Sequence, residues 1–321
     1  MNKASRLILA LGIAITMAMA LVGQATALDP RFKDTDGDLV ADTPADAKDQ
    51  IDPPVLIFAY TPVEDPAVYA KVWDGFLRHM EKTTGKRVQF FPVQSNAAQI
   101  EAMRAGRLHV AGFNTGATPL AVNCAGFVPF TIMSSKDGTY GYQMELVTYP
   151  GSGIDKVEDL KGKKVAFTAE TSNAGFKAPA AILREKFNLV VGKDIEAVFS
   201  GKYDNSILGV VNKDYPAAAV ANSVLKRMIA RGVLKADQIK SLYASDSFPT
   251  TAYGAVYNLK PELMKKIEQA FFTFQWEGSG LHNEFKNNQP PVDNFLRITY
   301  KDNWKIIRDV DAALNISYAC K

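Results

Sequence analysis

The chain has 321 residues, and its 37 Lys and Arg residues against 34 Asp and Glu residues give a formal net charge of +3 at pH 7. This near balance argues against nucleic acid as a partner, because a protein that neutralises phosphates needs a strongly basic face. The length is enough for two domains of ordinary size, each with its own hydrophobic core.

The first 27 residues have the pattern of a secretory signal peptide. Lys3 and Arg6 form a basic start, an apolar run follows, and Ala25 and Ala27 complete an A-x-A cleavage signal. The apolar run is short for a membrane-spanning helix, which needs roughly 20 residues. We therefore expect a mature chain that begins near Leu28 and is released into the periplasm. No Cys follows the cleavage site, so no lipid anchor is expected.

An acidic stretch lies in the next segment, residues 28–52. Its carboxylates alternate around a glycine, as in loops whose oxygens converge on calcium, at Asp34, Asp36, Asp38 and Asp42. The Glu that closes an EF-hand loop is missing, and so is the buried strand that carries the aspartates of haloacid-dehalogenase-type phosphatases. Nearby prolines and small polar residues indicate a solvated N-terminal arm. The alternative is a weak calcium site at Asp34, Asp36 and Asp38.

Strand-like and helix-like segments alternate after this arm. Residues 55–60 (VLIFAY) form a β-rich run, and the helix that follows starts with a proline and stops at Gly85. One face of this helix is apolar, with Tyr69, Trp73, Phe76, Leu77 and Met80 at helical spacing. Strands at 87–93 and 108–113, with a helix at 96–106 between them, extend a pattern that is typical of βαβ units.

The second part of the chain repeats this plan. Strands and helices are predicted to alternate through 163–168, 178–187, 195–200, 204–211, 217–220, 222–232 and 239–245. Two apolar runs, 141–153 and 248–263, are long enough to cross between two lobes. The predicted fold class is α/β, with two lobes that are each a mainly parallel sheet flanked by helices, joined by two extended hinge crossings.

The predicted lobe one comprises residues 53–145 and 254–321, and the predicted lobe two comprises residues 146–253. Two such lobes form a cleft between them, and ligands of open α/β sheets bind outside the carboxyl ends of the strands. This plan in a secreted protein is typical of a solute receptor that closes on its ligand.

Cys124 and Cys320 are the two cysteines of the chain. In an oxidising compartment such a pair is a disulfide candidate. The bridge would tie the C-terminal tail back to the first lobe. The alternative is one buried thiol and one loose C-terminal thiol.

The stretch FTAETSNAGFKAP (167–179) places Thr171, Ser172 and Asn173 where a predicted strand gives way to a helix. One such residue is enough to cap the helix. Three donors in a row beside a helix N-terminus also favour a binding site for an anion. From the residues alone, capping and anion binding both remain open.

Several stretches across residues 53–300 resemble the phosphate/phosphite/phosphonate-binding proteins of ABC importers. They are LIFAYTPVEDPAVY, QIEAMRAGRLHVAGF, DLKGKKVAFTAETSNAGFKAP, FSGKYDNSILGVVNKDYPAAAVANSVL and VYNLKPEL, in the expected order. The resemblance implies a type II two-lobed periplasmic binding protein that holds a phosphoryl head group with neutral donors. It implies no cofactor and no catalysis, a monomer, and the membrane permease of an ABC importer as partner.

Part of the family's binding loop matches this sequence residue by residue. Tyr60, at the end of the first strand, matches a tyrosine that reaches the head group. Ser172 and Asn173 match a Ser-Thr-Ser-type loop, with Thr171 beside them. Ala174 stands where a third hydroxyl is common.

Other positions depart from the family pattern. Tyr203, next to Asp204, stands where the family often has His, and Thr118 falls near a position that is often Tyr. Pro216 stands where an Asp often accepts a proton from the ligand. These departures leave open which phosphorus oxyanion is bound, but the resemblance still implies the class of protein.

A secreted phosphoester hydrolase is the alternative function. The sequence has no G-x-S-x-G motif, and its three histidines, His79, His109 and His282, are scattered without the spacing of metal ligands. A scaffold or adhesion module is disfavoured because the sequence has no repeats. Binding of a phosphorus oxyanion without turnover would separate a receptor from an enzyme.

Overall fold

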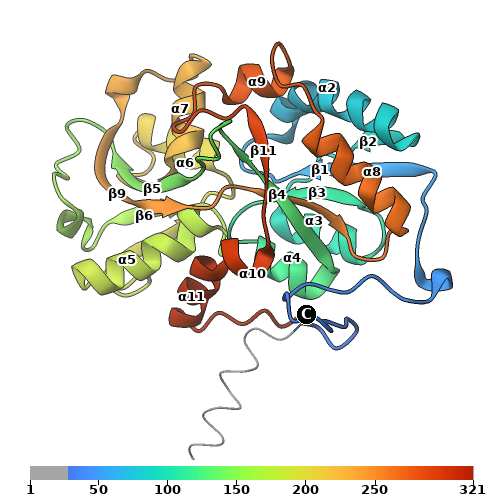
Figure 1. Cartoon of the computed structure of the whole chain (residues 1–321). Helices are drawn as coiled ribbons and strands as arrows, with labels where there is room; N and C mark the ends of the chain where they lie inside the picture. The colour runs from blue at the N-terminus through green and yellow to red at the C-terminus, as the bar shows by residue number, and fades with distance from the viewer. Residues whose placement is uncertain (1–27, 321) are drawn as a thin grey trace, which may run out of the picture.

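The computed structural model describes residues 28–320, so the predicted signal peptide lies outside the described residues. The chain forms two lobes, each built on one sheet (Figure 1). The sheet of lobe one has the order β11 (Asn294–Arg297), β4 (Phe127–Ser134), β10 (Ala252–Val256), β3 (Val110–Phe113), β1 (Val55–Tyr60) and β2 (Arg87–Phe90). The sheet of lobe two has the order β7 (Glu196–Phe199), β6 (Lys164–Phe167), β8 (Ala217–Ala221), β5 (Tyr142–Thr148) and β9 (Lys240–Phe248).

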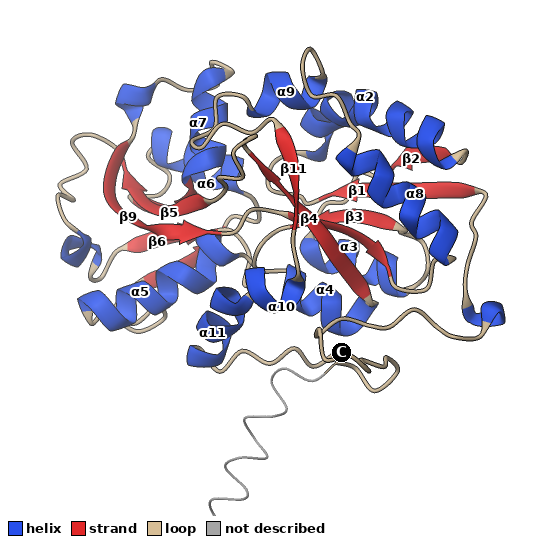
Figure 2. Cartoon of the chain, in the orientation of Figure 1, coloured by secondary structure: helices blue, strands red, loops and turns tan. Residues whose placement is uncertain are grey.

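Helices flank both sheets (Figure 2). Lobe one carries α2 (Pro66–Thr84), α3 (Asn96–Arg104), α4 (Thr118–Ala125), α8 (Pro261–Phe272) and α9 (Gly280–Phe285), and lobe two carries α5 (Ala178–Phe187), α6 (Tyr203–Val211) and α7 (Asn222–Ala230). The C-terminal α10 (Tyr300–Asn303) contacts β4, and α11 (Lys305–Ala313) contacts α5 of lobe two. Short helical turns are Ala47–Asp49, Val157–Leu160, Ala236–Gln238 and the π-helical η4 (Asn173–Lys177). This architecture confirms the predicted two-lobed α/β fold.

Both sheets are mixed, but most strands of each sheet run in one direction, in line with the prediction. In lobe one, β1 pairs in parallel with β2 and β3, whereas β10 is antiparallel to β3 and β4. In lobe two, β6 pairs in parallel with β7 and β8, whereas β5 is antiparallel to β8 and β9. The antiparallel strands β5 and β10 are those by which the chain enters lobe two and returns from it.

Each of the two runs expected to cross between the lobes contributes a strand to a sheet, β5 within residues 141–153 and β10 within residues 248–263. The chain changes sheet between β4 and β5, in residues 135–141, and between β9 and β10, in residues 249–251. The predicted lobe boundaries at 145/146 and 253/254 fall inside β5 and β10. Long apolar runs indicated an extended backbone correctly, but a buried strand and a hinge crossing have the same local sequence pattern.

Helix α2 shows how the local sequence fixes an element. The Asp65 side chain accepts a hydrogen bond from the Ala67 amide at the N-terminus, and Gly85 ends the helix in a left-handed conformation with φ of 72°. The first is a standard helix-start signal, and the second is a standard helix-stop signal. The apolar face predicted for this helix is buried, and Trp73 packs against Phe58 of β1, with ring centroids 4.7 Å apart.

The N-terminal arm is exposed over much of its length, and it is also held against lobe one at several points. The Ile51 amide donates to the carbonyl of Asn258 over 2.8 Å, and the Phe32 ring meets Tyr257 with centroids 4.9 Å apart. Val40 is buried as well. Within residues 28–320, no helix combines the length and the hydropathy of a membrane span.

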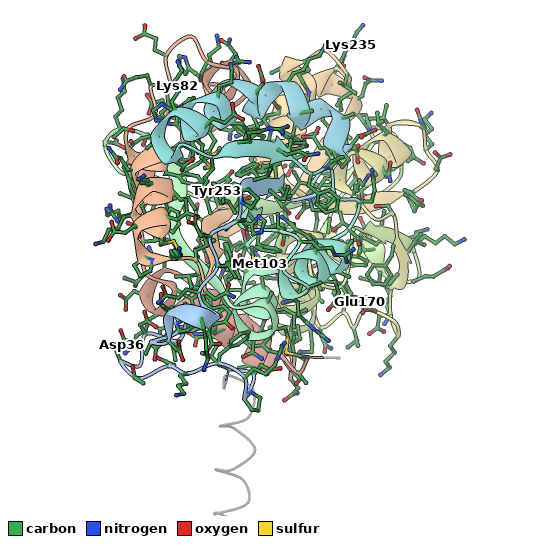
Figure 3. The ribbon with its side chains drawn as sticks, turned by 90° about the vertical axis from the view of Figure 1, so that its right-hand side faces the viewer. Asp36, Lys82, Met103, Glu170, Lys235 and Tyr253 are labelled. Atoms are coloured by element: carbon green, nitrogen blue, oxygen red, sulfur yellow. A yellow bond between two sulfur atoms is a disulfide. The ribbon has the colours of Figure 1, made fainter. Side chains whose placement is uncertain are left out.

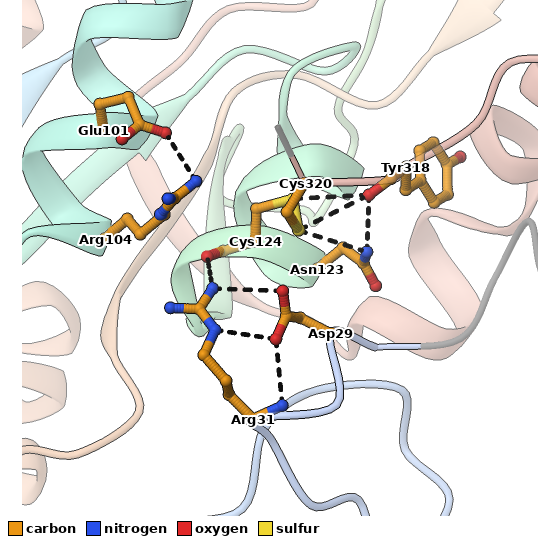
Figure 4. A network of polar contacts seen from close by, with 8 residues as sticks. All are labelled: Asp29, Arg31, Glu101, Arg104, Asn123, Cys124, Tyr318 and Cys320. Carbon is orange, nitrogen blue, oxygen red and sulfur yellow. Dashed lines mark hydrogen bonds and ion pairs between the residues drawn. A yellow bond between two sulfur atoms is a disulfide. The ribbon is translucent and has the colours of Figure 1, made fainter.

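A disulfide joins Cys124, in α4, to Cys320 at the C-terminus (Figure 4). Beside it, the Asn123 amide donates to the carbonyl of Tyr318 over 2.7 Å, and the Arg31 guanidinium donates to the carbonyl of Cys124 over 3.0 Å. The C-terminal tail and the N-terminal arm thus meet at one end of α4.

Loss of this disulfide should destabilise the protein without abolishing its fold. The bridge closes a loop across a sequence separation of 196 residues, and cross-links of this kind restrict the unfolded chain. We expect Cys124→Ser/Cys320→Ser to lower the free energy of unfolding by about 2–5 kcal/mol, measured by urea denaturation. Wild-type protein unfolded in the presence of a thiol reductant is the matched control and should show the same decrease. Equal stability of all three samples would contradict the prediction.

Candidate functional site

A cavity of about 70 Å³ lies between the two lobes. Tyr60 ends β1, Asn114 follows β3 and Ala221 ends β8, so the cavity lies at the carboxyl ends of parallel strands from both sheets. This is where ligands of open α/β sheets bind. The lining residues are Tyr60, Val63, Asn114, Thr115, Met133, Gly141, Tyr142, Asn173, Tyr203, Ala221, Ser223, Val224, Arg227, Thr250, Thr251, Tyr253, Phe285, Asn288 and Val292.

The loop between β6 and α5 forms one wall of this cavity. Ser172 Oγ accepts from the Gly175 amide over 3.1 Å and so caps the π-helical turn η4. A Cβ atom at Gly175 would lie 1.9 Å from Thr168 Oγ1, so only glycine allows the turn to fold this tightly. Asn173, the next residue after the cap, lines the cavity. The Thr-Ser-Asn run therefore combines capping with a contribution to the cavity wall.

Tyrosine hydroxyls are prominent at this wall. Tyr203 Oη and Ser172 Oγ are hydrogen-bonded over 2.8 Å, and Asn173 Nδ2 donates to Tyr142 Oη over 3.0 Å. Burial raises the pKa of Tyr60 to about 12 and raises the pKa of Tyr142 and Tyr203 above the ordinary value. All three phenols are therefore protonated near neutral pH and can donate hydrogen bonds.

Four predicted site residues lie outside the cavity lining: Ser172, the cap described above, and Thr118, Thr171 and Asp204. Thr118 Oγ1 donates to the carbonyl of Asn114 over 2.9 Å, in the first turn of α4. Thr171 Oγ1 accepts from Asn96 Nδ2 over 2.8 Å. Asp204 Oδ2 accepts from the Asp65 amide over 3.1 Å, and burial raises the pKa of this carboxyl group. Thr171 and Asp204 thus connect the lobes, whereas Thr118 stabilises a helix start.

Pro216 does not occupy the place that the sequence suggested. It precedes β8, whose parallel pairing with β6 aligns Ala217 with Val165. Pro216 is therefore at the amino end of β8, and Ala221, at the carboxyl end, lines the cavity. The strand assignment was correct, but the equivalence with a ligand-facing Asp was wrong because the register within the strand could not be fixed from the sequence.

The two lobes approach each other closely beside the cavity. A Cβ atom at Gly116, which lies between β3 and α4 of lobe one, would be 2.4 Å from the carbonyl oxygen of Thr171 and 2.5 Å from the amide nitrogen of Asn173. The Lys177 ammonium group, in η4, donates to the carbonyl of Gly116 over 3.0 Å and to Asp311 Oδ2 over 2.9 Å. The described arrangement is therefore a closed one.

A second set of contacts between the lobes is a network of four charged side chains, in which Glu64 and Arg227 are buried and Arg231 is partly exposed. Glu64 follows β1, Glu284 lies in α9, and both face Arg227 and Arg231 of lobe two. Arg231 contacts both carboxylates, and Arg227 lies 3.7 Å from Glu64 and 3.4 Å from Glu284. Tyr69 Oη donates to Glu64. The Arg227 and Glu64 side chains are 6% and 2% exposed, so this pair is shielded from solvent.

Arg227 also lines the cavity, and the sequence reasoning missed it. A signal was present: Val224, Arg227, Met228 and Arg231 follow the i, i+3, i+4, i+7 spacing of one helix face. Val224 and Met228 are apolar and buried, so an arginine between them is also expected to be buried. Asn114, Thr115, Tyr142, Ser223 and Thr251 were missed as well, because they lie just after strands, at the start of β5 or α7, or in a loop, and none is part of a distinctive motif.

The histidines and the acidic stretch lie elsewhere. The Ile57 amide donates to His109 Nδ1 over 3.0 Å, His79 is hydrogen-bonded to Thr273, and His282 lies in α9. Carboxylate oxygens of Asp34, Asp36 and Asp42 lie within 4.8 Å of one another, whereas Asp38 accepts from the Val40 amide. Figure 3 shows Asp36 at the edge of the molecule and cavity-lining Tyr253 in its interior. The calcium site stays a prediction, with Asp42 closer to the other carboxylates than was expected.

Comparison with curated proteins gives two informative relatives. The phosphate-import protein PhnD of Mycolicibacterium smegmatis is 31% identical over 229 residues, which are 68% of this chain and 71% of that protein. The phosphonates-binding periplasmic protein of Escherichia coli is 25% identical over 236 residues, covering 72% of this chain and 69% of that protein.

Solved structures show the same fold. A binding protein component of an ABC phosphonate transporter from Pseudomonas aeruginosa superimposes with a TM-score of 0.74 at 23% identity, covering 82% of this chain and 87% of that one. PhnD1 from Prochlorococcus marinus, in complex with methylphosphonate, has a TM-score of 0.72 at 16% identity and covers 83% of this chain and 100% of that one. These similarities identify the type II two-lobed periplasmic binding fold.

The family profile described as ABC transporter, phosphonate, periplasmic substrate-binding protein matches residues 58–293. That match spans both sheets except their last strand, β11, together with all the cavity-lining residues. Together with the relatives above, it shows that this chain belongs to the family of phosphonate ABC transporter periplasmic substrate-binding proteins.

Proposed function

We propose that this chain is an extracytoplasmic receptor that binds one phosphonate, phosphite or phosphate ion in the cavity between its lobes. In this proposal, residues 1–27 direct the chain to the periplasm, and the monomeric receptor delivers its ligand to the permease of an ABC importer without chemical change. The observation that carries the proposal is the closed cavity at the carboxyl ends of strands from both sheets, where protonated phenols and an amide converge.

The chemistry of the lining supports an oxyanion. Phenol, hydroxyl and amide groups can each donate a hydrogen bond to a phosphoryl oxygen, and donors to an ionised acceptor form the stronger class of hydrogen bonds. Tyr60 offers such a group from lobe one, and Tyr203 offers one from lobe two. Asn114 and Thr115 also line the cavity, but their side chains already donate hydrogen bonds within lobe one and to the carbonyl of Pro249. A ligand held by both lobes stabilises the closed arrangement.

Asn173 lines the cavity and has one polar side-chain atom that makes no hydrogen bond within the described residues. Its Oδ1 is buried and has no partner among the described residues, while its Nδ2 donates to Tyr142. A half-turn of the amide exchanges these two atoms. The Tyr142 phenol then donates to Oδ1, and the amide NH₂ group faces the cavity as a donor to the anion. The names of the two curated relatives, one for phosphate import and one for phosphonate binding, support the same class of ligand.

The ligand class can be tested directly by calorimetry. We expect purified protein, from which bound ligand has been removed by unfolding and refolding, to bind phosphate, phosphite or methylphosphonate with one site per chain. Sulfate serves as the control for a general anion site, and p-nitrophenyl phosphate serves as the test for turnover. Absence of heat with all three phosphorus oxyanions, or steady release of p-nitrophenol, would contradict the proposal.

Truncation of Asn173 should weaken binding far more than truncation of its neighbour. A hydrogen bond to a charged group contributes roughly 1.5–3 kcal/mol, which corresponds to about a 10- to 150-fold change in Kd. We expect Asn173→Ala to raise Kd by at least tenfold. Thr171→Ala is the matched control, because Thr171 is two residues away, bonds to Asn96 and does not line the cavity; its Kd should stay within about threefold of the parent value.

Calorimetry on both variants measures this difference, and thermal unfolding without ligand reports on folding. If Asn173→Ala keeps an affinity within about threefold of the parent, or if Thr171→Ala loses as much, the assignment of Asn173 to the ligand is wrong.

Closure should depend on the absence of a side chain at Gly116. An alanine there forces the backbone of residues 171–173 away from lobe one, whereas an opened protein has room for it. We expect ligand to decrease the radius of gyration of the parent protein in small-angle X-ray scattering, and Gly116→Ala to reduce both this decrease and the affinity. Gly75→Ala, within α2, is the control, since a Cβ atom there meets no atom within 4 Å. Equal compaction of both variants would argue against closure around the ligand.

A further inference from the structure

The cavity contains one charged side chain, and its sign bears on which ligands can enter. Among the lining residues, all of which lie in the described part of the chain, Arg227 is the one with a formal charge, and none is Asp or Glu. The other lining groups are phenols, hydroxyls, amides and apolar side chains. A phosphonate whose substituent carries an ammonium group would therefore meet a guanidinium and no carboxylate in this cavity.

We infer that Arg227 makes this site select against phosphonates with a positively charged substituent, so that its ligands are phosphorus oxyanions with an uncharged substituent or none. The inference rests on the proposed function and narrows its ligand class. Arg227 is thereby assigned as a specificity-determining residue of the cavity.

The nearest carboxylates are already occupied. Glu64 is engaged by Tyr69 and by both arginines, and Glu284 Oε1 lies 3.4 Å from Arg227 Nε and 2.7 Å from Arg231 Nη1. Neither glutamate lines the cavity. An ammonium group of a ligand would thus have to compete with two arginines for carboxylates that lie behind the cavity wall.

Desolvation makes this arrangement unfavourable for a cation. An ammonium group that leaves water needs a compensating partner, and the cost is large when none is supplied. Like charges also repel more strongly where little water screens them. The Arg227 charge is balanced by Glu64 and Glu284. The cavity lining, in contrast, offers an ammonium group only uncharged acceptors, such as the buried Asn288 Oδ1. A methyl group in the same position needs no partner and loses no hydrogen bond.

Two ligands of equal size distinguish the effect of the ligand's charge from the effect of its volume. Aminomethylphosphonate and ethylphosphonate have the same number of non-hydrogen atoms and differ by an ammonium group in place of a methyl group. We expect calorimetry on the wild-type protein to give at least tenfold tighter binding of ethylphosphonate, a difference of about 1.4 kcal/mol. Phosphate and methylphosphonate, measured in parallel, report whether the site binds phosphorus oxyanions at all.

The role of Arg227 is tested by replacing either of two arginines with methionine: Arg227 in α7, or Arg231 directly after this helix. Arg227→Met removes the charge at the cavity, and we expect the preference for ethylphosphonate to fall by at least tenfold. Arg231→Met is the control, because Arg231 has the same two glutamate partners as Arg227 but does not line the cavity. In this variant the ratio of the two affinities should stay within about threefold of the wild-type ratio. Because Arg227→Met leaves a buried carboxylate underpaired, Arg227→Met/Glu284→Gln, which removes one charge of each sign, provides the same test in a neutral network.

The possible results of these binding measurements lead to different conclusions. Equal or tighter binding of aminomethylphosphonate by the wild-type protein overturns the inference and leaves the proposed function intact. Binding of phosphate or methylphosphonate with neither larger ligand also overturns it, because volume rather than charge then selects. An unchanged ratio in folded Arg227→Met or in the double variant removes the assignment to Arg227. If no phosphorus oxyanion binds, the proposed function and the inference fail together.

Discussion

The network of Glu64, Glu284, Arg227 and Arg231, with the Glu64–Arg227 pair buried at its centre, is the interaction on which the geometry of the cavity depends. Taking charged groups out of water costs several kcal/mol per ion, and the cost is offset only where every partner is in place. Here one side of the network belongs to lobe one and the other to α7 of lobe two. The charges therefore fix one relative position of the lobes, and removal of a single partner leaves a buried charge, which costs about 3–5 kcal/mol in comparable cases.

A second chain of contacts leads from the C-terminus to the same cavity. The disulfide to Cys320 holds the tail on lobe one, and two residues earlier Tyr318 Oη donates to Asp311 Oδ2 over 2.8 Å. Asp311 in turn accepts from Lys177 in the turn that also contains Asn173. Because these groups are buried and mutually bonded, the position of the binding loop depends on a segment that lies far from it in the sequence.

Local sequence determined most of the secondary structure and part of the site. Asp65, Pro66 and Gly85 mark the ends of α2, and the apolar stripe between them identifies its buried face. Tyr60, Asn173 and Tyr203, which the family resemblance implied as ligand-binding residues, all line the cavity at the carboxyl ends of parallel strands. Thr118 and Pro216 were misplaced because a shift of a few residues along a helix or strand turns a side chain to another surface, and the sequence does not specify that register.

The sequence by itself thus determined the alternation of strands and helices and the two-lobed class, because hydrophobic periodicity and turn residues act over short distances. The family was implied separately, by the resemblance of several stretches that occur in the expected order. The tertiary structure alone decided that β5 and β10 are antiparallel inner strands, that Cys124 meets Cys320, and that Arg227 faces the cavity. Each of these depends on contacts between segments that are distant in the chain. Their free energy comes from desolvation and from partners that exist only after both lobes have folded and met.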